Sequence, residues 1–209
     1  MTTMFDTTIR CPACDTSFQV RTVGSCGAAG QDTDFRPKYW GANPLPHFVH
    51  TCPNCLFSGT SGHFEGAVDD RLRAWLASEK ALGTRAPKSA SARFALAARC
   101  REQARDDALS VADLYLRGSW CARSEGDREV ERRCQQATAE HLTAGLEANQ
   151  VPQEELDTIR YLLGEIHRRL GDFDRAVTLL ERVTEGQIGE LAKRQLEFAR
   201  AKNSDNTSI

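Results

Sequence analysis

Apolar side chains recur at helical spacing through most of the chain. From residue 67 onward they fall three or four positions apart, which places them on one face of an α-helix. The first such stretch predicts a helix whose buried face carries Val68, Leu72, Trp75, Leu76 and Leu82. The segment GTRAPKSA (83–90) then interrupts the pattern with glycine and proline, so a new helix is expected after it.

The same spacing predicts six further helices. Pro152 suits the first position of one of them, because the first turn of a helix leaves its backbone N–H groups unbonded. The polar segment NSDNTSI (203–209) is expected to be a flexible tail. The six helices are expected to begin at a Ser89 or Ser91 cap, near residue 107, after SEGD (124–127), at Pro152, at Phe173 and near residue 187.

Residues 1–66 follow a different pattern, with short alternating stretches and many glycines and prolines. In SFQVRTV, Phe18 and Val20 would share one face of a strand, and HFVHT (47–51) is a second strand candidate. We therefore predict a mainly α protein with a small β part. Its expected domains are a zinc-ribbon-like lobe at 1–66 and a TPR-like helical stack at 67–202, followed by the tail.

Four cysteines form two Cys-Pro-x-Cys turns, CPAC at 11–14 and CPNC at 52–55. A two-residue gap lets both sulfurs of one turn face a common ion, and two turns complete a tetrahedral sulfur shell of the kind that selects zinc. Four thiolates leave no position for a catalytic water, so we expect one structural zinc ion on Cys11, Cys14, Cys52 and Cys55. The alternative is a redox CxxC pair, which would need a βαβ setting.

Other candidate ligands lie near the second turn. Cys26, His47, His50 and His63 could join the metal site or support it, but packed or surface side chains are the simpler interpretation. The remaining cysteines fall on helix faces and are expected to be small buried side chains; they are Cys100, Cys121 and Cys134.

Composition and charge narrow the class of protein. The 209 residues are 40% hydrophobic and 27% charged, with a formal net charge of −2. This balance gives no general attraction to nucleic acid or acidic membranes. Neither a signal peptide nor an apolar run long enough to span a bilayer is present. A cytoplasmic protein with metal-bound and buried thiols is therefore expected.

Residues 162–183, LLGEIHRRLGDFDRAVTLLERV, follow the pattern of a tetratricopeptide repeat. Gly164 and Ala176 would let two helices approach closely, and Gly171 would lie at the turn between them. A generic helical hairpin is the alternative. Because one repeat cannot bury its own faces, the neighbouring helices would stack on it.

With these motifs in view, the chain resembles a prokaryotic family known as domain of unknown function 2225. The resemblance covers nearly the whole chain and depends on four stretches. It implies an amino-terminal zinc ribbon, the same four cysteine ligands and TPR-like helices, but no reaction. Asp15 departs from the family pattern, in which a glycine is common after the first turn. The stretches are CPACDTSF, DTDFRPKYWGANPLPHFVHTCPNCLFSG, LYLRGSWCARSEGD and LGEIHRRLGDFDRAV.

A non-catalytic protein-interaction scaffold is the function that this pattern favours. Stacked helix pairs offer a groove for an unknown protein or peptide partner. Polar and aromatic side chains on the first helix of each pair are the candidate contacts: Tyr115, Arg117, Arg168 and Arg169.

Two alternatives stay open. A nucleic-acid-binding ribbon could stack bases on Tyr39 and Trp40, although residues 1–66 hold four Lys or Arg against five Asp or Glu. An enzyme is the third possibility, with Asp32 and Asp34 binding a second cation beside His47 or His50. The sequence holds no P-loop, GxSxG, HExxH or dinucleotide motif, so we expect no catalysis.

Overall fold

Helices make up most of the structure. The protein is described by a computed structural model covering residues 2–184 and 186–207. In these residues none of the helices is both long and apolar enough to cross a membrane. The α-helices are α1 (Asp70–Ala81), α2 (Ala90–Ala104), α3 (Ala108–Glu125), α4 (Arg128–Glu147), α5 (Leu156–Leu170), α6 (Phe173–Leu180) and α7 (Gly186–Arg200).

The strands form three separate antiparallel pairs that precede the helices. Phe18 and Val20 lie half-buried on one face of the second strand, as their alternation predicts. The strand expected at 47–51 is shorter than predicted, because His47 ends a 3₁₀ turn and only His50–Thr51 is extended. The pairs are β1 (Thr3–Arg10) with β2 (Ser17–Ser25), β3 (Ala28–Gln31) with β4 (Pro37–Tyr39), and β5 (His50–Thr51) with β6 (Ser58–Gly59).

Aspartate and serine side chains cap most of the helices. Ser89 accepts a hydrogen bond from the Ala92 backbone N–H and starts α2, so the first of the two predicted caps is confirmed. Gly126 and Gly171 end α3 and α5 in the left-handed conformation that glycine adopts easily. The aspartate caps are Asp69, Asp107, Asp127 and Asp172.

Two boundary predictions are wrong. Leu82 was expected on the buried face of the first helix, but it is the residue after α1 and is 81% exposed. Its N–H closes the last turn of α1, after which Gly83 turns the chain away. Pro152 precedes the 3₁₀ turn η3 (Gln153–Glu155), and α5 itself begins at Leu156.

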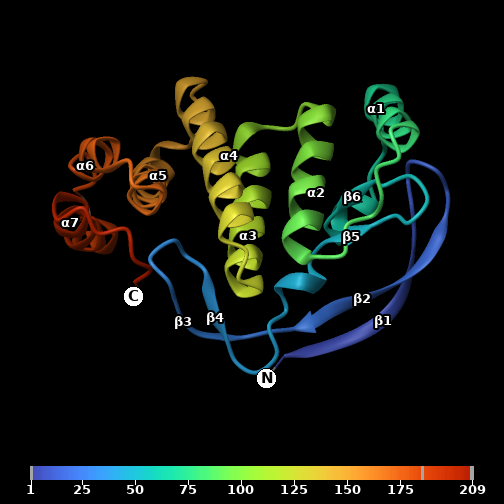
Figure 1. Cartoon of the computed structure of the whole chain (residues 1–209), viewed down its shortest axis with the longest axis horizontal. Coiled ribbons are helices and arrows are strands. Elements are labelled where there is room, and N and C mark those ends of the chain that lie inside the picture. Colours follow the sequence, from blue (N-terminus) through green and yellow to red (C-terminus); the bar gives the residue numbers. More distant parts are fainter. Residues whose placement is uncertain (1, 185, 208–209) are drawn as a thin grey trace.

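Helices α2, α3 and α4 stand side by side as the centre of the molecule (Figure 1). The β1–β2 hairpin curves along one end of this layer, and β5 and β6 lie beside α2. Helices α5, α6 and α7 form a group at the opposite side from α1. Consecutive helices therefore pack as neighbours along the chain.

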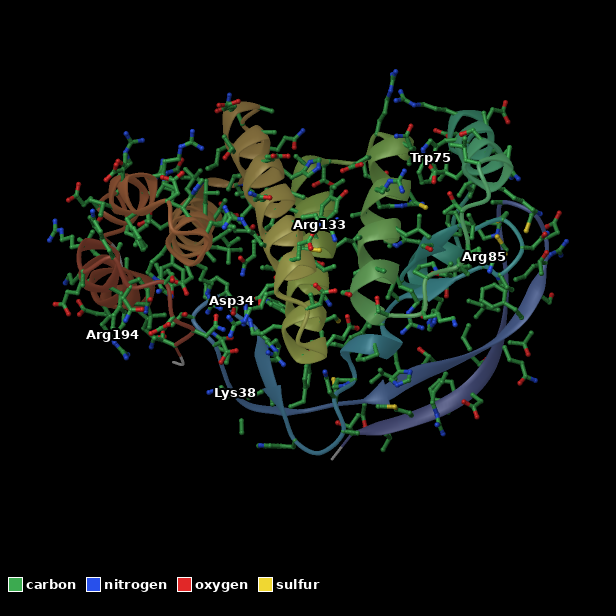
Figure 2. All side chains as sticks on the ribbon, in the orientation of Figure 1. Asp34, Lys38, Trp75, Arg85, Arg133 and Arg194 are labelled. Atoms are coloured by element: carbon green, nitrogen blue, oxygen red, sulfur yellow. The ribbon has the colours of Figure 1, made fainter. Side chains whose placement is uncertain are left out.

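Residues 203–207 fold back onto the molecule. The carbonyls of Asn203 and Asp205 accept hydrogen bonds from the Arg168 guanidinium at 2.6 and 2.9 Å. The carbonyl of Thr207 accepts from the Thr33 N–H at 3.1 Å. In Figure 2, Asp34 lies close to these contacts, between α4 and the group of helices α5 to α7. The tail predicted to be flexible is thus docked over residues 203–207, while 208–209 lie outside the described residues.

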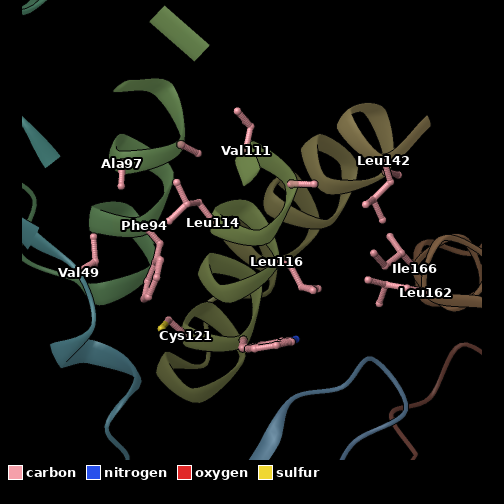
Figure 3. Close-up of a cluster of buried hydrophobic side chains, with 14 of the residues drawn as sticks. Val49, Phe94, Ala97, Val111, Leu114, Leu116, Cys121, Leu142, Leu162 and Ile166 are labelled. Atoms are coloured by element: carbon pink, nitrogen blue, oxygen red, sulfur yellow. The ribbon is translucent and has the colours of Figure 1, made fainter. Parts of the chain in front are cut away.

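Two hydrophobic cores join the predicted lobes. Leu45 and Val49 pack into the main core with side chains from α2, α3 and α4, including Phe94 and Leu114 (Figure 3). A second core combines the two cysteine turns with α1 and α2. Packing is therefore continuous across residue 66. The second core contains Cys11, Cys52, Leu56, Phe57, Phe64, Leu72, Leu76, Leu96 and Cys100.

Candidate metal centre

Each pair of cysteines lies in the turn of a β-hairpin, between β1 and β2 or between β5 and β6. The two turns have the same backbone hydrogen bonds. The carbonyl of Cys11 accepts from the Asp15 N–H at 2.8 Å, and that of Cys52 accepts from the Leu56 N–H at 3.0 Å. In both turns the N–H of the first cysteine donates to the carbonyl five residues later. One local geometry therefore serves both halves of the site.

The residue after each second cysteine has a left-handed backbone. Asp15 has φ of 58° and Leu56 has φ of 70°, where glycine would be unstrained. The glycine that the family resemblance leads us to expect at position 15 would fit this geometry. Aspartate tolerates the conformation better than most residues, and the predicted ligation by Cys14 is not disturbed.

The four cysteine sulfurs converge on one point. The Sγ atoms of Cys11 and Cys55 are 3.5 Å apart, those of Cys14 and Cys52 are 3.6 Å apart, and all four lie within 4.8 Å of one another. A tetrahedral shell with Zn–S bonds of about 2.3 Å has S–S edges of about 3.8 Å. The group could therefore hold a metal ion on Cys11, Cys14, Cys52 and Cys55 together.

Backbone amides orient the sulfurs toward this point. The N–H groups of Ala13 and Cys14 donate to Cys11, and those of Asn54 and Cys55 donate to Cys52. A hydrogen bond from the Cys55 thiol is the largest cause lowering the pKa of Cys11 to about 5. Burial raises the pKa of Cys52 to about 11. Because ligation needs thiolates, a bound cation would replace the protons that the group otherwise shares.

Helix α1 holds both turns from outside. Arg73 donates to the carbonyls of Pro12, at 2.9 Å, and Ala13. Lys80, two helical turns later, donates to the Asn54 side chain at 2.9 Å. Four thiolates around a divalent cation keep a net negative charge, which these two cations offset. Sequence reasoning missed both residues, since only the fold brings α1 alongside the turns.

A family model described as "Uncharacterized protein conserved in bacteria (DUF2225)" matches residues 4–205. The chain belongs to this family. The predicted resemblance is thereby confirmed over nearly the whole length. No curated protein and no solved structure matches the chain. The family description names no activity for this DUF2225 member.

The histidines near the second cysteine turn contribute to local packing and to a 3₁₀ turn. His50 is buried beside Phe64, and burial lowers its pKa to about 4. His63 accepts the Thr60 N–H at 3.0 Å through Nδ1, closing the 3₁₀ turn η2 (Ser61–Phe64). Burial also lowers the pKa of His47. Within the described residues, the four cysteines are the only group of three or more His, Cys, Asp or Glu side chains that could hold a metal.

The other cysteines do not contribute to the site. Cys26 is exposed in the connection between β2 and β3, away from the four ligands. Cys100, Cys121 and Cys134 are buried, as predicted from their helix faces. Burial raises their thiol pKa values, to about 11 for Cys100 and Cys134 and about 12 for Cys121, so they stay protonated at neutral pH.

Two of the predicted docking residues are wrong, because their guanidinium groups are buried inside the chain. Arg168 is fully buried, bonded to Glu165 at 2.8 Å and to the tail carbonyls. The Arg169 side chain is 2% exposed and pairs with Glu165 at 2.7 Å. Nothing in helical periodicity reveals the tail that covers them. A glutamate three or four residues before each arginine was the available signal.

Asp32 and Asp34 face arginines instead of histidines. Asp34 pairs with Arg123 at 2.6 Å and with Arg169 at 3.4 Å. Burial alone would raise the pKa of Asp34, but the two arginines outweigh it and hold the pKa below its usual value. Asp32 pairs with Arg123 and Lys38. The DTDFRP stretch lies in the connection between β3 and β4, and these ion pairs attach that connection to α3 and α5.

The other docking candidates lie on α3. The Tyr115 hydroxyl donates to Glu102 at 3.0 Å, and its ring stacks on His141 with centroids 5.8 Å apart. Arg117 pairs with Asp113 one helical turn away and remains about one-third exposed.

The aromatic pair considered for base stacking is divided between core and surface. Tyr39 is half-buried and packs against the main core between the helices. Trp40 is 54% exposed. The two rings therefore do not share one environment.

Proposed function

We propose that this protein is a non-catalytic interaction module, in which one zinc ion stabilises the amino-terminal hairpins and the helices bind a protein or peptide partner. The observation that supports it most is the position of the four sulfurs. They close a shell at the turns of two hairpins, and Cys11 and Cys52 are also part of the core shared with α1 and α2. A metal there stabilises the surface of the helical layer as well as the hairpins.

The chemistry of the donor set favours zinc in a structural role. Four thiolates at tetrahedral spacing suit zinc, and they leave no coordination position for a reacting water. The amino-terminal hairpins bury few aliphatic side chains of their own. Zinc binding adds on the order of 10 kcal/mol to small structural sites of this kind.

The TPR-like interpretation has local support in the α5–α6 hairpin. A Cβ atom placed on Gly164 would lie 2.8 Å from Leu180 Cγ, so these helices touch where the repeat pattern has small residues. Ala176 is fully buried at the same contact. Stacked helices of this kind bind peptides or partner proteins along one face.

Elemental analysis tests the metal assignment. Freshly purified protein should contain about one zinc per chain, and Cys14→Ser should lose it. Cys26→Ser, which changes an exposed cysteine outside the group, is the matched control and should keep the metal. Absence of stoichiometric zinc from the wild type, or a cluster with iron absorption, would refute the assignment.

Affinity purification of the tagged protein from the native cell tests the docking role. A partner protein should co-purify in stoichiometric amount, and nuclease treatment should not reduce its recovery. If the recovered material is instead nucleic acid, binding with a steep salt dependence, the ribbon would be a nucleic-acid reader and the proposal would fail.

A further inference from the structure

A groove of about 360 Å³ lies between α2 and α4, with α3 behind it. Its floor is mostly apolar, formed by Ala95 and Leu96 of α2 and by Val130 and Cys134 of α4. Tyr115 of α3, one of the four docking residues predicted from the sequence, also lines it. A volume of this size is sufficient for one or two side chains of a bound segment.

Arginine is the charged residue type among the residues that line the groove, and no acidic side chain lines it. Arg85 comes from the segment before α2, Arg99 from α2 and Arg133 from α4. Figure 2 shows Arg133 in the gap between α4 and α2, with Arg85 on the far side of α2 from α4. The three cations therefore come from separate segments around one apolar floor.

The arginines differ in how firmly they are held. Arg99 pairs with Glu79 at 2.7 Å and lies over the Trp75 ring at 5.0 Å. Arg133 has a 3.7 Å pair with Glu129, in which both side chains are more than half exposed, so that pair contributes little. Among the described ion pairs none includes Arg85. Arg85 and Arg133 are thus available to a ligand, whereas Arg99 is held in place by Glu79 and Trp75.

Tyr115 defines the inner end of the groove. Its hydroxyl is bonded to Glu102, which also lies 3.0 Å from His141 Nε2. With its polar atom engaged, the Tyr115 ring adds apolar surface where it lines the groove. The groove therefore offers hydrophobic contact with positive charge around it.

We propose that this groove binds an acidic peptide segment of the partner protein, with one apolar side chain on the floor and flanking carboxylates paired to Arg85 and Arg133. Charge complementarity is the argument for this occupant. A nucleic-acid strand fits less well, because the apolar floor offers no partner to a sugar–phosphate backbone and only Arg85 and Arg133 are free to pair with its successive phosphates. The proposal rests on the docking function above and names its site and the chemistry of its ligand.

Selection from a phage-displayed library of random peptides on the zinc-loaded full chain tests the proposal. Enriched peptides should combine Asp or Glu with a single Leu, Ile, Phe or Trp. One enriched peptide, labelled with fluorescein, then serves as the probe for fluorescence polarisation. Enrichment of basic or purely apolar peptides, or no enrichment, would overturn the proposal.

Substitutions then locate the bound peptide. Arg133→Glu and Arg85→Glu should each weaken binding of the probe at least tenfold, and Ala95→Trp, which fills the floor, should abolish it. Arg194→Glu on the exposed face of α7 makes the same charge change elsewhere and should bind normally. Circular dichroism melts identify any variant that fails to fold. Equal binding by well-folded groove variants would refute this site.

The two proposals fail in different ways. A partner protein that co-purifies equally with wild type and with Arg133→Glu would retain the docking function and reject the groove. If no partner co-purifies and no peptide is enriched, both proposals fall.

Discussion

Asp15 and Leu56 occupy equivalent positions in the two cysteine turns but differ in what their side chains do. Both have a left-handed backbone, with φ of 58° and 70°. Asp15 is exposed and its ion pair with Arg10 is open to solvent, whereas Leu56 is 3% exposed and belongs to the core. A glycine would relieve backbone strain at both positions. Only at Leu56 would it also remove a buried side chain.

We expect Asp15→Gly to change the free energy of unfolding by less than about 1 kcal/mol, because relief of strain offsets chain entropy. Leu56→Gly should cost about 2–5 kcal/mol through lost burial. Urea titrations of the zinc-loaded variants measure both. Equal losses at the two positions would show that the backbone, and not burial, decides the outcome.

Asp34 is buried between Arg123 and Arg169, which lower its pKa against the effect of burial. A carboxyl whose folded-state pKa is depressed adds stability above its unfolded pKa, about 3.9. That stability is lost as the pH falls through the lower folded value. Asp34 therefore stabilises the protein at neutral pH and not in strong acid.

Asp34→Asn should lower the free energy of unfolding by about 1.5–3 kcal/mol at pH 7, because Arg123 and Arg169 each lose one carboxylate partner and keep another, Glu131 and Glu165 respectively. The difference from wild type should shrink below about pH 4. Asp6→Asn, in the exposed pair with Arg21, is the control and should cost under about 1 kcal/mol at any pH. A pH-independent difference at Asp34 would contradict the assignment.

The α5–α6 hairpin is the element whose sequence pattern and structure agree most closely. Gly164, Gly171 and Ala176 occupy the close contact, the left-handed turn and the buried face that were expected of two packed helices at these positions. Helix spacing was equally informative for α2 and α3, since their inward faces hold the predicted Phe94 and Leu114. The ends of the helices were less predictable, as Leu82 and Pro152 show. The apolar spacing can continue past the residue at which capping or a turn ends the helix.

Gly164→Ala should destabilise the protein by about 1–3 kcal/mol, even though alanine normally favours a helix. Its new methyl group would meet Leu180, which is 1% exposed and has no free space to move into. Thermal unfolding followed by circular dichroism measures the effect. Gly62→Ala, where a Cβ atom meets nothing within 4 Å, should unfold at the wild-type temperature or above. Stabilisation by Gly164→Ala would mean that α5 and α6 are farther apart.

At the scale of the whole molecule, contacts between segments distant in sequence connect residues 203–207 to α5 and to the loop between β3 and β4. The tail carbonyls of Asn203 and Asp205 accept from Arg168, and Thr207 reaches Thr33 in the loop between β3 and β4. Arg168 is thereby buried between α5 and the tail. Residues 203–207 therefore act as part of the fold.

Ending the chain at Lys202 should lower the free energy of unfolding by about 1–3 kcal/mol, because the Arg168 guanidinium loses two carbonyl acceptors. Asp205→Ala keeps the backbone carbonyl and should be nearly neutral. Differential scanning calorimetry compares the two with wild type. Wild-type stability of the truncated protein would show that residues 203–207 contribute nothing.

The sequence by itself determined the group of four cysteines that could hold a metal ion, the family, most helices and the α5–α6 hairpin. These features depend on the spacing of residues that are close in sequence. The geometry of a turn or a helix then fixes where their side chains lie relative to one another. Tertiary structure alone decided that Arg168 and Arg169 are buried, that Arg73 and Lys80 bond to the two cysteine turns, and that Arg85 and Arg133 border one groove. Those outcomes depend on which distant segments meet, and packing of the whole chain decides that.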